Sequence, residues 1–181
     1  MGATVNNHIK ERDFYTKVKE ALEKKFRNDG FHVHFEITAN KVDDRFLLKN
    51  RTLLNYRGRI LRPDIMGLIW RKNSKNKKLI IAEFKEKPKF RDIFQTKGYD
   101  ELFDSDVAYL LSAESISESS KSAMAFINNN AELLKTKQGK SEIYVKFIHE
   151  TEDGNLHLAI LGSETNLPDE YETIQRLLKD C

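Results

Sequence analysis

The chain has 181 residues, of which 39% are hydrophobic and 33% charged, and its formal net charge is +3, as is typical of one water-soluble globular domain. No apolar run approaches the roughly 20 residues of a membrane helix, and no charged-then-apolar leader precedes a cleavage site, so we expect a single cytoplasmic domain over residues 1–181 with no membrane partner. The only cysteine, Cys181, excludes an internal disulfide framework and a multi-cysteine zinc or iron-sulfur site, so any metal would need oxygen or imidazole ligands.

The first predicted element is a helix from about residue 8 to residue 28, followed by a glycine stop at Gly30. Apolar residues recur there at helical spacing: Phe14, Val18, Ala21, Leu22 and Phe26. With a step of about 100° per residue, Glu11 lies on the same side as this stripe and is expected to face inward. On the pattern alone, Glu11 is either a first-turn acid matched to the helix dipole or a carboxylate directed at an active site.

Residues 31–38 alternate apolar and polar side chains, which predicts a strand with one polar face. His32 and His34 share that face, where they are either metal ligands or, more commonly, ordinary exposed residues. Residues 39–56 are mixed and highly charged, and they predict a loop that contains a short helix or an added strand.

Strand character is predicted at residues 58–70, with Pro63 breaking the ladder just before Asp64, and at residues 79–85. A polar turn joins the two and is short enough for an antiparallel hairpin. Because side chains alternate along a strand, Glu83 and Lys85 share one face. The hairpin would bring Asp64, early in its strand, opposite these late residues of the next. The spacing therefore predicts that two carboxylates and a lysine converge.

Such a cluster suits the hydrolysis of phosphodiester bonds. Asp64 and Glu83 would bind Mg²⁺ or Mn²⁺, and the backbone carbonyl of Phe84 would be a further ligand. A bound divalent ion lowers the pKa of water and polarises the phosphate, and Lys85 would orient or deprotonate that water. The alternative is a structural ion pair across a hairpin.

Positive charge is concentrated around this cluster. Residues 41–91 hold 16 of the 31 Lys and Arg residues and five of the acids, so this segment carries +11 and the rest of the chain −8. Such a segregation is typical of a surface that neutralises nucleic-acid phosphates. The run from residue 71 to residue 78, taken alone, is more typical of a solvated turn.

The C-terminal half contains a further series of predicted elements: a helix at 92–103, a strand at 106–112, a helix at 117–135, a hairpin of strands 143–149 and 156–161, and a helix from Pro168 to about Asp180. Gln95 and Tyr99 are four residues apart and share a helical face. Tyr99 could also simply pack against Phe103.

Arg62-Pro63-Asp64 followed by Glu83-Phe84-Lys85 resembles the signature of the PD-(D/E)XK nuclease superfamily. Gln95 with Tyr99 is similar to the QxxxY element of its RecB-like members, and residues 8–31 resemble the opening of archaeal Holliday-junction resolvases. The resemblance covers about residues 8–113. It implies a restriction-endonuclease-like α/β core, which is a central mixed sheet flanked by helices in the order helix, three strands, helix, strand. Residues 114–181 would form a C-terminal helix-hairpin-helix extension.

The resemblance also implies a deoxyribonuclease that depends on Mg²⁺ or Mn²⁺, acts on DNA rather than RNA, and uses Asp64, Glu83 and Lys85, with Glu11 completing the metal site. Gln95 and Tyr99 would hold Lys85 or a DNA phosphate. The residues expected to contact nucleic acid are Arg59, Arg62, Lys87, Lys89, Arg91, Gln95 and Tyr99. Two alternatives stay open: a Holliday-junction-resolvase-like endonuclease that acts as a homodimer, and a non-catalytic nuclease-fold subunit that binds nucleic acid.

Overall fold

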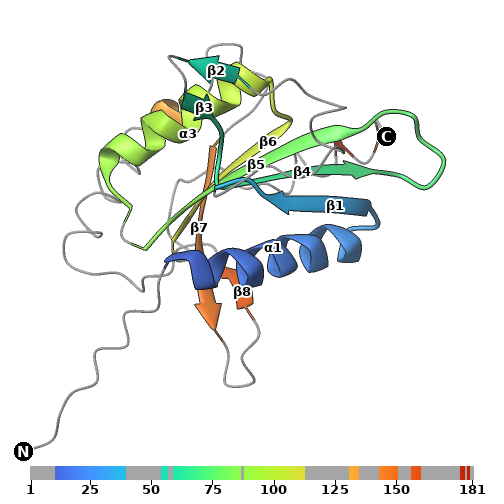
Figure 1. The fold of residues 1–181 in the computed structure, drawn as a ribbon. Helices are drawn as coiled ribbons and strands as arrows, with labels where there is room; N and C mark the ends of the chain where they lie inside the picture. The colour runs from blue at the N-terminus through green and yellow to red at the C-terminus, as the bar shows by residue number, and fades with distance from the viewer. Residues whose placement is uncertain are drawn as a thin grey trace, which may run out of the picture.

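A computed structural model describes residues 11–39, 54–56, 59–86, 88–112, 131–134, 143–150, 156–159, 176–177 and 179. These residues form an α/β fold in which a six-stranded mixed sheet lies between the helices α1 and α3 (Figure 1). No helix in these ranges is long and apolar enough to cross a membrane.

The elements in chain order are α1 (Glu11–Asn28), β1 (His32–Ile37), β2 (Leu54–Tyr56), β3 (Arg59–Leu61), β4 (Ile65–Trp70), β5 (Lys78–Lys85), α3 (Phe90–Phe103), β6 (Val107–Ser112), the 3-10 turn η1 (Ala131–Leu134), β7 (Ile143–Glu150) and β8 (Leu156–Ala159). Residues 176, 177 and 179 are helical. The predicted order of helix, three strands, helix and strand is confirmed by α1, β1, β4, β5, α3 and β6, with the short β2–β3 pair inserted.

The strands of the large sheet lie in the order β1-β4-β5-β6-β7-β8. β4 pairs antiparallel with both β1 and β5, whereas β6 pairs parallel with both β5 and β7. The predicted β4–β5 hairpin is therefore confirmed. Within the sheet, β5 is the strand at which the pairing changes, since it pairs antiparallel with β4 and parallel with β6.

Alternate residues of β5 face different helices. Ile80, Ala82 and Phe84 belong to the apolar core under α1, where the ring of Phe14 stacks on Phe84 at 5.5 Å. Leu79 and Ile81 belong to the core under α3. Since side chains two apart share a face, Glu83 and Lys85 lie on the α3 side of the sheet, as the sequence predicts for their common face.

Helix α1 packs on the sheet through the predicted apolar stripe. Val18, Leu22 and Phe26 are fully buried, and burying each such side chain stabilises the fold by about 1.5–3 kcal/mol. The helix ends at Asn28, and Gly30 follows with φ of +88°, a left-handed conformation that glycine adopts without strain.

The strand character predicted over residues 58–70 is confirmed, and so is its interruption at Pro63. The chain forms β3 and β4 with a break at residues 62–64, where Pro63 has no amide hydrogen to donate. β3 then pairs with β2 in a separate two-stranded sheet, and this β2 is an added strand within residues 39–56.

The predicted C-terminal hairpin is confirmed by β7 and β8, which pair antiparallel. It does not form a separate extension, however, since β7 continues the central sheet beside β6. Of the predicted helix 117–135, residues 131–134 form a 3-10 turn instead. The other residues of that helix, and most of the final helix, lie outside the described residues.

Candidate active site

Asp64, which directly precedes β4, and the last residues of β5 lie at the same end of the β4–β5 hairpin. Ile65 pairs with Ala82, which places Asp64 beside Glu83. The Asp64 amide donates to Oε1 of Glu83 at 3.1 Å, and the Phe84 amide donates to Oδ2 of Asp64 at 3.0 Å. Each carboxylate is therefore held by the backbone of the other strand.

The end of β1 fixes the backbone of Asp64 from the other side. The carbonyl of Asp64 accepts hydrogen bonds from the amides of Thr38 at 2.8 Å and Ala39 at 3.0 Å. The buried hydroxyl of Thr38 donates to the carbonyl of Pro63. In the sequence, the only sign of this function of Thr38 is a polar residue at the end of the predicted strand 31–38.

Lys85 bridges the two carboxylates. Its Nζ lies 3.2 Å from Oδ2 of Asp64 and 3.1 Å from Oε2 of Glu83. The side chain of Glu83 is only 1% exposed, against 14% for Asp64 and 23% for Lys85. The cluster is therefore a partly buried centre with one buried acid and two groups that reach solvent.

Burial and the neighbouring charge of Asp64 raise the pKa of Glu83 to about 8, although Lys85 opposes the rise. Burial lowers the pKa of Lys85, but the attraction of Glu83 and Asp64 outweighs it, so that the pKa is raised overall. Lys85 is thus a persistent cation. Two carboxylates so close together disfavour full ionisation, and a further positive charge would relieve this repulsion.

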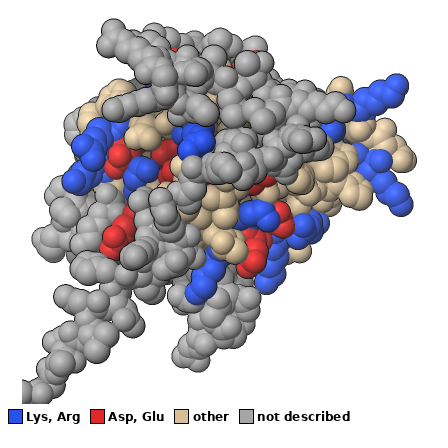
Figure 2. All heavy atoms as spheres, in the orientation of Figure 1, with Lys and Arg blue, Asp and Glu red and all other residues tan. Residues whose placement is uncertain are grey.

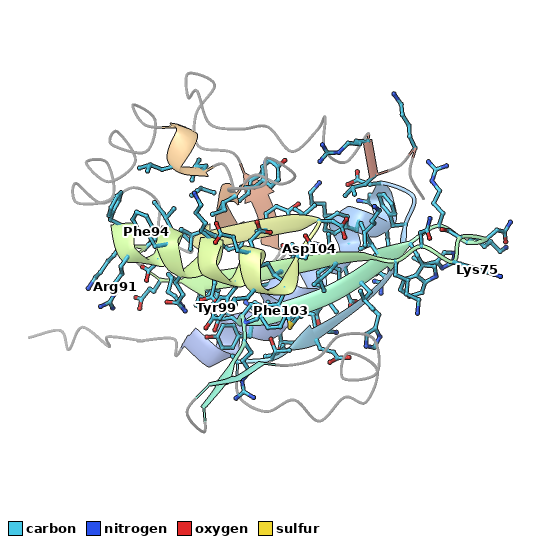
Figure 3. All side chains as sticks on the ribbon, turned by 90° about the horizontal axis from the view of Figure 1, so that it is seen from above. Lys75, Arg91, Phe94, Tyr99, Phe103 and Asp104 are labelled. Atoms are coloured by element: carbon cyan, nitrogen blue, oxygen red, sulfur yellow. The ribbon has the colours of Figure 1, made fainter. Side chains whose placement is uncertain are left out.

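Helix α3 supplies the next layer of the site. Nε2 of Gln95 donates to Oε2 of Glu83 at 3.1 Å, so the partner of Gln95 is this carboxylate and not Lys85. Tyr99, one turn further on, is half-buried, and burial and the charge of Glu83 raise its pKa. Its ring also lies 6.4 Å from that of Phe103 (Figure 3). Tyr99 therefore combines the structural contact with a position near the acids.

The basic residues predicted to contact nucleic acid occupy different settings. Arg62 donates to the carbonyl of Ala39 at 3.2 Å. Lys89 is exposed at the N-cap of α3, and the side chain of Arg91 is 81% exposed with Nε 3.7 Å from Asp92. Lys87 and the side chain of Arg59 lie outside the described residues.

Glu11 is the first residue of α1, and its side chain lies outside the described residues. Its direct or assisting role stays a prediction.

The two histidines of β1 have partners. His32 stacks on Trp70 at 6.0 Å, and Nε2 of His34 lies 2.7 Å from Oε1 of Glu36. Within the part of the chain that the structure describes, no three side chains of His, Cys, Asp or Glu gather into a metal-binding group.

Asp64 and Glu83 nevertheless have the donor chemistry that a hard divalent ion requires. Mg²⁺ is commonly held by one or two carboxylates, and its other ligands are waters and substrate phosphates. Among hydrogen bonds between described residues, Asp64 uses only Oδ2 and leaves Oδ1 available. Burial and the charge of Asp64 keep the pKa of Glu83 raised even with Lys85 beside it, so a bound divalent cation would favour the ionised form of this carboxylate. The pair fits Mg²⁺ or Mn²⁺.

No protein-family model matches the chain, and neither does any curated protein sequence.

Proposed function

We propose that the protein is a metal-dependent nuclease that hydrolyses DNA phosphodiester bonds, with a restriction-endonuclease-like core. The observation that carries this proposal is the convergence of Asp64, Glu83 and Lys85 at the end of the β4–β5 hairpin. The sequence resemblance to PD-(D/E)XK nucleases supports the same assignment of roles, and so does the position of Gln95 on Glu83.

Asp64 and Glu83 would hold Mg²⁺ or Mn²⁺, with the carbonyl of Phe84 as a further ligand and the carboxylate of Glu11 as the one implied by the resemblance. The ion would supply an acidified water and polarise the phosphate. The backbone contacts of Asp64 and Glu83 fix both carboxylates before substrate arrives, which reduces the reorganisation needed during reaction.

Lys85 would act as a hydrogen-bond donor and a positive charge. Because its pKa is raised by the two carboxylates, its ammonium stays protonated at neutral pH and is a poor general base. It is suited to orient the attacking water and to stabilise negative charge that develops on the phosphate oxygens. Arg91 and Lys89, which are exposed on α3, would attract the DNA backbone.

The test is cleavage of plasmid, single-stranded, flapped and four-way-junction DNA with Mg²⁺, with Mn²⁺ and with a chelator. We expect the parent protein to cut at least one substrate only when metal is present, and Asp64→Ala and Lys85→Ala to cut none at a comparable rate. A parent that cuts nothing, or variants that cut as well as the parent, would contradict the proposal. Circular dichroism of each variant checks that it is folded.

The same panel separates the two alternatives. A junction resolvase would prefer the four-way junction and act as a symmetric dimer, because two opposed strands must be nicked together. A strictly monomeric protein in solution would argue against it. A non-catalytic subunit would bind DNA and cut none of the substrates.

A further inference from the structure

Two phenylalanines near the start of α3 are exposed to solvent. Phe90 is 40% exposed and Phe94 49%, and their rings meet edge to face, with centroids 5.0 Å apart. Large apolar side chains at the surface are common as single residues, whereas these two rings together offer a contiguous apolar surface to a ligand. Phe94 directly precedes Gln95, which contacts Glu83 of the candidate active site.

The two residues that flank Phe90 in sequence are cationic. Lys89 precedes Phe90, and Arg91 lies between the two phenylalanines with 81% of its side chain exposed. Arg91 and Phe94 lie at the same end of α3 (Figure 3). Aromatic rings beside Lys and Arg are the combination that binds single-stranded nucleic acid, since the rings stack with bases and the cations neutralise phosphates.

A glycine extends this surface towards the active site. With a step of about 100° per residue, Gly98 lies between Phe94 and Gln95 around the helix. A Cβ at Gly98 would meet no atom within 4 Å, and its φ is not positive. Neither packing nor backbone conformation requires glycine here, although glycine weakens a helix relative to alanine. The missing side chain leaves a low surface between Phe94 and Gln95.

We infer that the α3 platform, defined as Lys89, Phe90, Arg91, Phe94 and Gly98, binds a single-stranded segment of the substrate. Bases stack on Phe90 and Phe94, phosphates lie beside Lys89 and Arg91, and the strand crosses Gly98 towards the active site. This inference rests on the proposed function and specifies its substrate class: nucleic acid with an unpaired segment beside the scissile bond. In an uninterrupted duplex, the bases stack on one another and are not available to the phenylalanines.

The test measures binding of the full-length protein in the presence of a chelator, so that nothing is cut. The probes are a fluorescent thymidine 12-mer, a strand of the same length and charge with abasic sugars, and a blunt duplex. We expect Phe94→Ala to weaken binding of the thymidine strand by about tenfold and to change binding of the abasic strand by less than about twofold. Leu102→Ala, which removes another exposed apolar side chain of α3, is the matched control and should bind like the parent.

A second variant tests the glycine. Gly98→Ala should raise the melting temperature, because alanine favours a helix, and yet weaken binding of both strands, because the methyl group obstructs the path of the backbone. A variant that gains stability and binds both strands like the parent would remove Gly98 from the platform and contradict this part of the inference.

Three results with Phe94→Ala would overturn the platform as a whole. The variant could bind the thymidine strand like the parent, it could lose affinity equally for the thymidine and abasic strands, or it could be monomeric where the parent is dimeric. The last result would assign the pair to contact between copies of the chain. Failure of the proposed function is distinguishable, because a protein that shows the predicted binding pattern but cuts no DNA contradicts only the nuclease activity. A protein that cuts DNA while Phe94→Ala binds normally contradicts only the platform.

Discussion

The two ends of the β4–β5 hairpin both carry charged residues, but in opposite environments. At one end, Asp64, Glu83 and Lys85 are within hydrogen-bonding distance of one another and largely buried. At the other end, residues 71–78 contain five cations and no acid, and four of these cations, Arg71, Lys72, Lys75 and Lys77, are exposed. Lysine and arginine gather at this outer end of the hairpin in Figure 2.

This difference shows that burial and partners, more than residue type, determine what a charge can do. The cations of the outer end are solvated. Lys77 lies over the ring of Trp70 at 5.5 Å, and Lys78 pairs with Asp106 at 3.3 Å. Solvated charges are screened by salt, whereas in the cluster the pKa values of Glu83 and Lys85 are both raised. A six-residue strand such as β4 spans about 20 Å, so the outer end lies far from the candidate active site.

The largest effect should come from removing one lysine at each end. Lys85→Ala is expected to lower kcat/KM for DNA cleavage by on the order of 10³, because a donor positioned at developing charge is lost. Lys75→Ala, at the exposed end, should change kcat/KM by less than about threefold, since exposed charges contribute little. Steady-state cleavage assays measure both values. Equal losses of kcat/KM in Lys85→Ala and Lys75→Ala would contradict the proposed difference between the two ends of the hairpin.

The second-largest effect is the change in the free energy of unfolding with pH. Glu83 has a pKa of about 8 in the fold against an ordinary value of 4.5, so the folded state keeps a proton that the unfolded chain releases in this interval. Without divalent metal, stability should therefore fall as pH rises from about 4.5 to about 8, by about 2–4 kcal/mol. Lys85 does not change this result. Its raised pKa contributes the same stability at every pH below about 10.5, and that contribution is lost only at higher pH.

Urea unfolding at pH 5 and pH 8.5 in a chelator measures this effect. Glu83→Gln should flatten the fall, and Glu101→Gln, at an exposed position of α3, should retain it. Added Mg²⁺ should restore stability to the parent at pH 8.5 more than at pH 5. A parent and a Glu83→Gln variant with the same pH dependence would show that Glu83 does not titrate in this range.

A smaller effect is expected from Gln95, which positions Glu83 through one hydrogen bond. Gln95→Ala should raise the Mg²⁺ concentration needed for half-maximal cleavage by about tenfold, the usual scale for residues that orient a metal ligand. It should leave the melting temperature within a few degrees of the parent. The assay is cleavage rate against Mg²⁺ concentration, with Glu101→Gln as the control. An unchanged Mg²⁺ requirement would mean that Gln95 contributes only to packing.

The smallest effect belongs to the exposed end itself. Replacing Lys72 and Lys75 together by Gln should leave kcat unchanged and reduce the salt dependence of DNA binding, by up to about one unit of the log–log slope for each lysine that contacts a phosphate. Anisotropy titrations at several salt concentrations measure the slope. A slope equal to that of the parent would mean that residues 71–78 form a solvated turn that does not contact DNA. A large fall in kcat would contradict the inference that these residues lie far from the candidate active site.

Local rules predict the candidate site well and its surroundings poorly. A short turn and the two-residue period of strands suffice to bring Asp64 beside Glu83 and Lys85. They do not reveal that Gln95 bonds to Glu83, because the rotation of α3 on the sheet depends on packing. Thr38 was missed for a similar reason, since its contact with Pro63 joins residues 25 apart in sequence.

The strand pairings of the sheet also divide into those that local sequence patterns predict and those that depend on long-range contacts. The predicted β7–β8 hairpin follows from its turn, but the parallel pairing of β7 with β6 joins strands that are separated by a long connection, and no local pattern specifies it. The exposure of Phe90 and Phe94 was also not predicted, because apolar residues in a helix are normally expected to face the core.

The most direct test of the central claim is a crystal structure of the protein soaked in Mn²⁺, examined by anomalous diffraction at the hairpin end. We expect an anomalous peak that contacts the carboxylates of both Asp64 and Glu83. Occupied Mn²⁺ sites elsewhere on the molecule, with Lys85 alone still bridging the two carboxylates, would contradict it.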